Sequence, residues 1–181
     1  MDWWIIAALI GAVFLLPTAY AGLIGAPWAP TRLPSVRRAF DDIGIGRDDL
    51  VVDLGAGDGS ILREAVSRGA RAFGYELSPV MWLIGCTRML RKKRISIHYG
   101  NFFNKKLPSD TTVVFLFLMP KHMERVGKYI VSQNLTKNTL VLSYAFPFKN
   151  VSSTRTYREP KCAPLYLYEV GELRSSFDPA A

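Results

Sequence analysis

The chain has 181 residues, of which 49% are hydrophobic and 12% aromatic. These values exclude wholesale disorder and allow one folded domain with an appendage. The formal net charge of +8 favours an anionic neighbour, such as anionic lipid headgroups or nucleic acid. Cys86 and Cys162 are too far apart for a metal-ligand pair and too few for a disulfide framework, so we expect no metal and a reducing compartment.

The first 24 residues form an apolar segment with no charge after Asp2. As a helix rising about 1.5 Å per residue, Trp3 to Ala21 would nearly match a ~30 Å hydrocarbon layer, and aromatic side chains lie near both ends. We therefore predict a transmembrane helix in residues 1–24 that contacts the lipid bilayer through residues 3–24. Arginines follow the segment, so the positive-inside rule predicts a single-pass membrane protein whose catalytic domain lies on the cytoplasmic side.

Two other interpretations of this segment remain open. Ala19-Tyr20-Ala21 resembles a signal-peptidase site, although Asp2 stands where a signal peptide carries basic residues. The segment would also suit a buried helix packed on the domain.

The rest of the chain divides into a proline-rich linker at 25–34, a domain at 35–174 and a loose tail at 175–181. The predicted strands are 50–54, 71–76, 95–99, 112–118, 139–146, 154–157 and 165–170. The predicted helices are 35–43, 60–68, 79–93 and 121–131. This alternation predicts an α/β fold, a Rossmann-like doubly wound and mostly parallel seven-stranded sheet. Because no helix separates the last two strands, we expect them to form a C-terminal antiparallel hairpin.

A glycine turn follows the first predicted strand in the stretch VVDLGAGDGS at 51–60. Gly55 and Gly57 permit positive φ and close backbone approach to a ligand. Glu76 ends the second predicted strand, where a carboxylate can accept hydrogen bonds from both hydroxyls of a ribose. The sequence therefore predicts an adenosine-type ligand at the carboxyl ends of these strands.

The turn excludes two of the three ligands that it suggests. Ser60 occupies the third-glycine position of the dinucleotide motif, and the chain has no Gly-Lys-Ser or Gly-Lys-Thr triplet of a P-loop. Asp53 and Asp58 would also repel a pyrophosphate. S-adenosylmethionine has no phosphate, and its sulfonium and ammonium groups are cationic. We therefore predict S-adenosylmethionine as the cofactor.

Together with Gly-Tyr-Glu-Leu-Ser-Pro at 74–79, the turn resembles the seven-strand (class I) S-adenosylmethionine-dependent methyltransferases. Ala-Pro-Trp-Ala-Pro-Thr at 26–31 and Phe-Pro-Phe at 146–148 narrow the resemblance to one branch. That branch holds the membrane-associated protein-lysine methyltransferases of the ATP synthase c-ring and adenine nucleotide translocase type, with their prokaryotic relatives. The resemblance covers residues 25–150, and the relatives tend to carry an apolar segment before the domain.

This resemblance implies where the cofactor binds. The implied residues are Pro30, Thr31, Asp53, Gly55, Ala56, Gly57, Asp58, Glu76, Leu77, Asn101 and Phe102. Pro30 and Thr31 would cover the cofactor from the N-terminal side. The relatives commonly place an acidic residue after the third strand, in contact with the adenine amino group. Here Asn101 stands in that position, and its amide oxygen can still accept a hydrogen bond.

The acceptor site is harder to predict. Methyl transfer to an amine requires loss of the amine's proton, and an aromatic, desolvating site lowers an amine pKa and can hold a methylated cation. Tyr144, Phe146 and Phe102 are candidate walls, although each would also suit the ordinary core. His98 and His122 are candidate bases, and both also fit ordinary structural roles. The sequence identifies no catalytic residue.

We therefore predict a membrane-anchored S-adenosylmethionine-dependent methyltransferase that modifies lysine on a membrane-associated protein. One alternative is an enzyme that methylates a lipid-soluble small molecule, such as a quinone or a lipid, and another is a non-catalytic cofactor-binding membrane module. Met119-Pro120-Lys121 after the fourth strand does not match the Asn/Asp-Pro-Pro-aromatic motif of nucleic-acid amino-methyltransferases, which weighs against a nucleic-acid partner.

Overall fold

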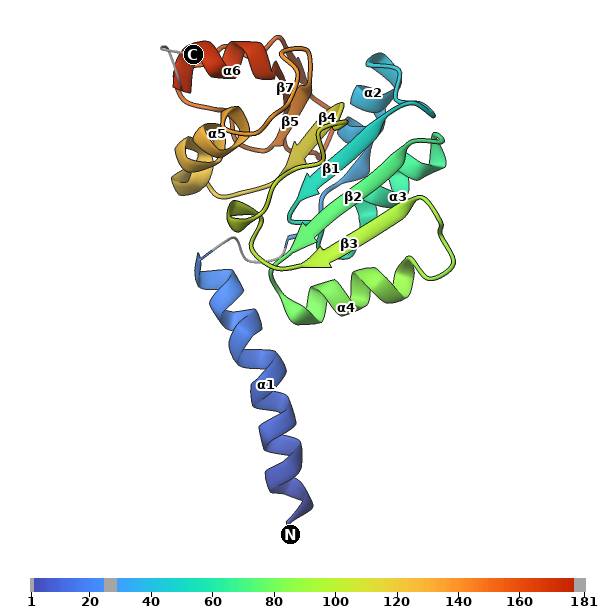
Figure 1. Ribbon diagram of the computed structural model, residues 1–181, viewed down its shortest axis with the longest axis vertical. Helices are drawn as coiled ribbons and strands as arrows, with labels where there is room; N and C mark the ends of the chain where they lie inside the picture. The colour runs from blue at the N-terminus through green and yellow to red at the C-terminus, as the bar shows by residue number, and fades with distance from the viewer. Residues whose placement is uncertain (1, 25–28, 178–181) are drawn as a thin grey trace.

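A computed structural model describes residues 2–24 and 29–177 of the chain. A long helix, α1 (Trp3–Ile24), precedes an α/β domain (Figure 1). The strands are β1 (Leu50–Leu54), β2 (Arg71–Glu76), β3 (Ile95–Tyr99), β4 (Val113–Leu116), β5 (Leu140–Tyr144), β6 (Arg155–Tyr157) and β7 (Leu165–Glu169). The helices of the domain are α2 (Leu33–Asp42), α3 (Ser60–Ser67), α4 (Pro79–Arg88), α5 (Met123–Val131) and α6 (Val170–Phe177), with the short 3-10 helices η1 (Phe102–Asn104) and η2 (Pro120–His122).

The seven strands form one mixed sheet in the order β3-β2-β1-β4-β5-β7-β6. The first five are parallel, β7 runs antiparallel to β5, and β6 runs antiparallel to β7. The predicted mostly parallel sheet with a C-terminal antiparallel hairpin is therefore confirmed. The chain moves outward from β1 to β3 and then returns to β4, so the order reverses between β1 and β4. Ligands of doubly wound sheets bind at such a reversal, outside the carboxyl ends of the strands.

Helices cover both faces of the sheet (Figure 1). Successive side chains of a strand point to opposite faces, so Val51 packs in the core under α2 and α3, while Val52 and Leu54 pack in the core under α5 and α6. All five residues of β1 are buried, as expected for a central parallel strand covered on both faces. Asp53 is the one charged residue in this strand, and its position next to the turn makes it a candidate for function.

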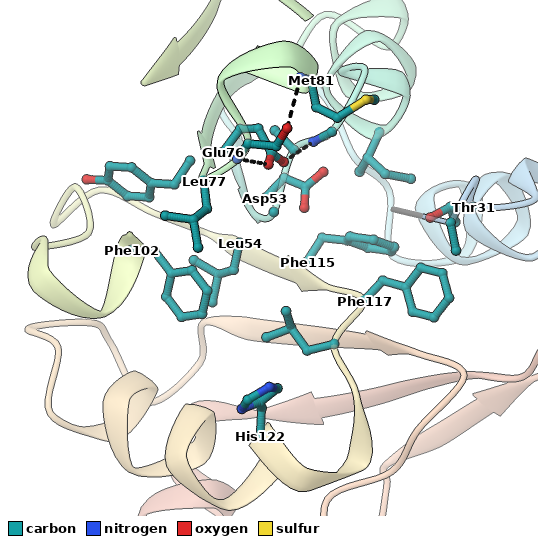
Figure 2. A pocket seen from close by; sticks show the side chains of 18 of the residues that line it. Thr31, Asp53, Leu54, Glu76, Leu77, Met81, Phe102, Phe115, Phe117 and His122 are labelled. Carbon is teal, nitrogen blue, oxygen red and sulfur yellow. Dashed lines mark hydrogen bonds between the residues drawn. The ribbon is translucent and has the colours of Figure 1, made fainter. Parts of the chain in front are cut away.

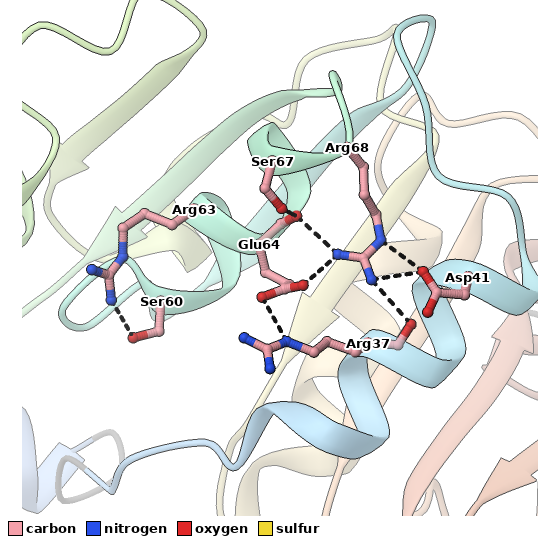
Figure 3. Close-up of polar contacts among 7 residues, drawn as sticks. All are labelled: Arg37, Asp41, Ser60, Arg63, Glu64, Ser67 and Arg68. Carbon is pink, nitrogen blue, oxygen red and sulfur yellow. Dashed lines mark hydrogen bonds and ion pairs between the residues drawn. The ribbon is translucent and has the colours of Figure 1, made fainter.

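Ion pairs fasten α2 to α3 (Figure 3). The Arg68 guanidinium contacts the Glu64 carboxylate and donates a hydrogen bond of 2.7 Å to Asp41 Oδ1. Arg37 Nε donates to Glu64 Oε2 at 3.1 Å. The Arg68 and Glu64 side chains are mostly buried, so solvent screens this pair less than it screens an exposed one. The network therefore holds α2 against the helix that begins at the glycine turn.

Three element boundaries differ from the sequence prediction. Helix α2 begins at Leu33 because Pro34 lies in the first turn, where a missing N–H breaks no hydrogen bond. Helix α4 ends at Arg88 rather than at 93, and the chain then turns through Arg91 at φ 69°. Residues 170–177 form α6, whereas we expected a strand end and a loose tail from 175. The apolar spacing of Val170, Leu173 and Phe177 was a helical signal that the prediction missed. The rest of the predicted tail, 178–181, lies outside the described residues.

Helix α1 contacts the domain through α4, and described apolar side chains such as Trp3 and Leu9 are exposed. Within residues 2–24 and 29–177, none of the helices combines the length and the apolar character that a membrane span requires. A spanning helix needs about 20 consecutive apolar residues to match a ~30 Å hydrocarbon layer, and the described residues of α1 do not meet that requirement. The prediction of a single-pass membrane protein anchored through residues 1–24 is contradicted by this finding.

Candidate functional site

A cavity of about 680 Å³ opens at the carboxyl ends of the parallel strands, where the strand order reverses (Figure 2). Its volume is typical of small-molecule sites. All the residues predicted to bind the cofactor line it, namely Pro30, Thr31, Asp53, Gly55, Ala56, Gly57, Asp58, Glu76, Leu77, Asn101 and Phe102. The fold therefore gathers segments from four parts of the sequence around one cavity.

The glycine turn folds over the end of β2. The backbone of Gly55 has φ 130° and that of Gly57 has φ 52°, conformations that residues with a side chain rarely adopt. The Ala56 N–H donates to the Tyr75 carbonyl at 2.8 Å, and the Gly57 N–H donates to Glu76 Oε2 at 2.8 Å. Glycine at these positions thus lets the turn bring its backbone against both β2 and the cavity.

Glu76 shapes this turn as well as facing the cavity. Its second carboxylate oxygen, Oε1, accepts a hydrogen bond from the Ser78 N–H at 2.7 Å. Burial raises the pKa of the Glu76 carboxyl, while the N–H groups of Ser78 and Gly57 oppose that rise by stabilising the charged form. Each oxygen has room for a further donor beyond its backbone N–H. The carboxylate can therefore hold the turn and still accept ribose hydroxyls.

Asp53 is the most unusual charged group of the site, being only 3% exposed. Burial raises the pKa of its carboxyl well above the ordinary value, and the nearby charges of Glu76 and Asp58 raise it further. Among the described residues, none donates a hydrogen bond that would offset the burial of this carboxylate. A buried acid among like charges is stabilised by a cation. The cationic groups of S-adenosylmethionine fit this position.

Asp58 is already neutralised within the protein. Its Oδ1 accepts hydrogen bonds from the Ser60 N–H at 3.1 Å and from Ser60 Oγ at 2.6 Å, next to the start of α3. Its Oδ2 pairs with Arg88 and lies 3.9 Å from Arg63 Nη2. The sequence prediction treated Asp53 and Asp58 as equivalent carboxylates of an acidic turn. The structure separates them, because arginines from α3 and α4 compensate only Asp58.

Asn101 begins η1 after β3. Its side-chain oxygen accepts a hydrogen bond from the Phe103 N–H at 3.0 Å, so part of its accepting capacity is already in use. Phe102 is buried, with its ring centroid 4.2 Å from that of Phe103. The predicted contact of Asn101 with adenine stays a prediction, which now depends on the remaining lone pair of the amide oxygen.

The candidate acceptor residues are only partly brought together. Phe102 and Phe146 line the cavity, whereas Tyr144 is buried behind its wall and packs edge-on against Phe117, 4.9 Å between ring centroids. His122 lines the cavity, and Figure 2 shows it on the opposite side from Asp53 and Glu76. His98 is not among the lining residues of the described chain. Its ring stacks on Phe73 at 4.7 Å.

The sequence prediction missed several lining residues. Phe115 and Phe117 extend from β4 and its end, and Arg125 follows His122 by one helical turn. The Arg125 guanidinium carbon lies 4.0 Å from the centroid of the Phe103 ring, a cation–π distance. The spacing of His122 and Arg125 was a visible signal, but only the fold shows that this end of α5 borders the cavity. Within the described ranges, no group of three His, Cys, Asp or Glu side chains could hold a metal ion.

Gly74 of β2 offers a test of how closely the turn must pack on the strand. A Cβ at this position would lie 2.6 Å from Ala56 Cβ and 2.9 Å from Leu62 Cδ1. Ala56 cannot yield without moving the turn. We expect Gly74→Ala to lower the free energy of unfolding by about 1–3 kcal/mol, as overpacking does, and to weaken cofactor binding.

Urea unfolding and calorimetry with S-adenosylmethionine would measure both effects. Gly46→Ala is the matched control, because a Cβ there would meet only the Gly44 carbonyl oxygen, at 3.7 Å. Wild-type stability and affinity in Gly74→Ala would show that the turn does not depend on this contact.

Comparisons with known proteins agree with the geometry of the site. Residues 53–155, more than half of the chain, match the family described as the ANTKMT methyltransferase domain. The chain is 28% identical over 156 residues to the Xenopus laevis lysine N-methyltransferase that is named for the c-ring protein of ATP synthase, covering 84% of this chain and 67% of that protein. It is 29% identical over 154 residues to a protein-lysine N-methyltransferase of Saccharolobus islandicus, covering 81% of this chain and 94% of that protein.

Among solved structures, an RNA methyltransferase of Salinibacter ruber in complex with S-adenosyl-L-homocysteine has the same fold. It aligns with a TM-score of 0.72 and 27% identity over 78% of this chain and 94% of that one. The cofactor and the reaction class therefore follow from the family, the fold and the chemistry of the cavity together. The chain is an S-adenosylmethionine-dependent methyltransferase and belongs to the family of the ANTKMT methyltransferase domain.

Proposed function

We propose that this methyltransferase modifies the side-chain amine of lysine in a protein substrate. The observation that carries the proposal is the division of the cavity into two unlike parts. Asp53 and Glu76 lie at one side, and aromatic side chains including Phe115, Phe117 and Phe146 line the rest. The names of the relatives from Xenopus laevis and Saccharolobus islandicus, both lysine methyltransferases, support the same acceptor.

In this proposal the acidic side holds the cofactor. Asp53 would bind its cationic amine, Glu76 its ribose, and Leu77, Asn101 and Phe102 its adenine. When bound, the cofactor supplies a methyl carbon activated by a positively charged sulfur. The carboxylate pair therefore supplies charge complementarity, while the methyl group needs only to be held in line with the acceptor.

The aromatic part of the cavity would receive the lysine. An apolar environment disfavours a charged amine, so it lowers the lysine pKa and raises the fraction that can act as a nucleophile. After transfer, the methylated amine is a cation again, and aromatic faces stabilise such a cation. Phe117 and Phe146 are the proposed walls of this half, and His122 remains a candidate for accepting the proton.

The proposed organisation of the chain follows from this site. Residues 29–32 would cover the cofactor, and residues 33–177 would form the methyltransferase domain. The acceptor lysine would enter opposite the acidic side, toward His122.

The acceptor class can be tested by transfer of a radioactive methyl group from labelled S-adenosylmethionine into a cell extract. We expect label that protease releases and that acid hydrolysis recovers as methyl-lysine. Label released by ribonuclease would point to RNA, as named for the Salinibacter ruber relative, and solvent-extractable label would point to a lipid-soluble small molecule. Either result would overturn the lysine proposal, as would intact cofactor binding with no transfer to any fraction.

A further inference from the structure

The segment that covers the cavity is tied down by two hydrogen bonds of one residue. Arg32 directly follows Pro30 and Thr31, which line the cavity. The Arg32 backbone N–H donates to the Tyr144 hydroxyl at 3.3 Å, and the Arg32 guanidinium donates to the Lys161 carbonyl at 2.8 Å. Tyr144 ends β5 and Lys161 lies between β6 and β7. These two contacts therefore fix the segment to distant parts of the domain.

Tyr144 is well placed to hold its hydroxyl still. Its side chain is buried, with 3% exposed, and its ring packs edge-on against Phe117 at 4.9 Å between centroids. The next residue, Ala145, lines the cavity in a left-handed backbone conformation with φ 70°, and its N–H donates to the Pro164 carbonyl at 2.8 Å. The ring is thus held on one side by the cavity wall, and its backbone continues directly into that wall.

We propose that Tyr144 is a positioning residue whose hydroxyl latches residues 29–32 over the cofactor. The proposal rests on the proposed function, in which that segment covers the cofactor. The same side chain contacts Phe117 of the acceptor half. It therefore couples the cover over one half of the cavity to the wall of the other. A closed cover excludes water and strengthens the electrostatic contacts inside the site.

Tyr144→Phe removes only the hydroxyl. A typical hydrogen bond contributes about 1 kcal/mol, and 1.4 kcal/mol corresponds to a factor of ten. We therefore expect the Kd for S-adenosylmethionine to rise about 5- to 10-fold, mainly through faster dissociation. The KM for the cofactor should rise while kcat at saturating cofactor stays near the wild-type value.

A second readout separates latching from a general structural role. In hydrogen exchange, the Arg32 amide should exchange faster in Tyr144→Phe, whereas the amides within β5 should keep their protection. Tyr157→Phe is the matched control, because its hydroxyl donates to Asp42 and the residue does not line the cavity. This control should leave the cofactor Kd unchanged.

The donor can also be removed without touching Tyr144. Arg32 has φ −78°, which proline can adopt, so Arg32→Pro deletes the N–H. Arg32→Ala keeps that N–H and deletes the guanidinium, so the difference between the two variants reports on the backbone bond. This pair keeps the proposal testable if Tyr144→Phe unfolds.

Unchanged cofactor affinity in Tyr144→Phe, or equal affinity in Arg32→Pro and Arg32→Ala, would overturn the latch. Cofactor binding is measured without an acceptor, so this outcome is distinct from a failure to find methyl-lysine.

Discussion

Asp53→Asn should raise the melting temperature of the cofactor-free protein at neutral pH and should weaken S-adenosylmethionine binding about 10- to 100-fold. The two effects have one cause. Burial and the charges of Glu76 and Asp58 disfavour the ionised Asp53 carboxylate, and the neutral amide removes that penalty. The amide also removes the negative charge that would pair with the cationic cofactor. A hydrogen bond to a charged group contributes about 1.5–3 kcal/mol, which gives the expected loss of affinity.

The pH dependence follows from the direction of the pKa shift. In the unfolded chain, the Asp53 carboxyl loses its proton near pH 3.9, whereas in the folded protein its raised pKa retains the proton to higher pH. Between these two values the folded state holds the extra proton, so the Asp53 contribution makes stability fall as pH rises. The advantage of Asp53→Asn should therefore be small below about pH 4 and should grow above it. Thermal unfolding over a pH series measures this difference.

Cofactor affinity should change with pH in the opposite direction. The cationic cofactor favours the ionised carboxylate, so wild-type affinity should rise with pH through the same window, and Asp53→Asn should lose that rise. Asp110→Asn is a suitable control, because Arg71 lowers the pKa of the Asp110 carboxyl at the surface. It should bind the cofactor normally and gain no stability. A lower melting temperature for Asp53→Asn at neutral pH would contradict the assignment.

Glu76→Gln should weaken S-adenosylmethionine binding about 100-fold. Both carboxylate oxygens of Glu76 accept backbone N–H groups, from Gly57 at 2.8 Å and from Ser78 at 2.7 Å. Either orientation of a glutamine amide places its NH₂ group against one of these donors. The substitution therefore breaks a charge-assisted bond of the turn and removes an acceptor for the ribose. Two such losses of about 1.5 kcal/mol each give the expected factor.

Isothermal calorimetry would measure this effect, with Glu172→Gln as the control. The Glu172 carboxylate also accepts a backbone N–H, from Glu169 at 3.1 Å, and a hydroxyl, from Thr154 at 2.9 Å. It lies outside the lining of the cavity, so its amide variant should bind the cofactor like the wild type. Equal affinities in wild type and Glu76→Gln would rule out a ribose-binding role for Glu76.

The cofactor side of the site was predictable because its residues are local to strand ends. Parallel strands bring their carboxyl ends to one edge of the sheet, so the glycine turn after β1, Glu76 at the end of β2 and Asn101 after β3 meet once the strands are identified. The positions of the five parallel strands were visible as short apolar runs. Helix α6 was missed because its short amphipathic pattern follows a strand without a turn signal.

The acceptor side was less predictable because it depends on which way each side chain of β5 and its neighbours points. Tyr144 and Phe146 both looked like cavity walls. In the fold, Phe146 lines the cavity, while Tyr144 is buried in the core under α2 and α3 and directs its hydroxyl to Arg32. A partner 112 residues away in sequence leaves no local signal at either position.

The sequence by itself determined the order of strands and helices, the glycine turn and the cationic cofactor, because each depends on residue types at short spacing. Only the tertiary structure decided which carboxylate of the turn is available. Asp53 and Asp58 look alike in the sequence. Burial in β1 leaves Asp53 without a compensating partner among the described residues, while Arg88, 30 residues away, neutralises Asp58. The difference arises because the charge of a carboxylate is set by the solvent and the ions that surround it after folding, and distant parts of the chain supply both.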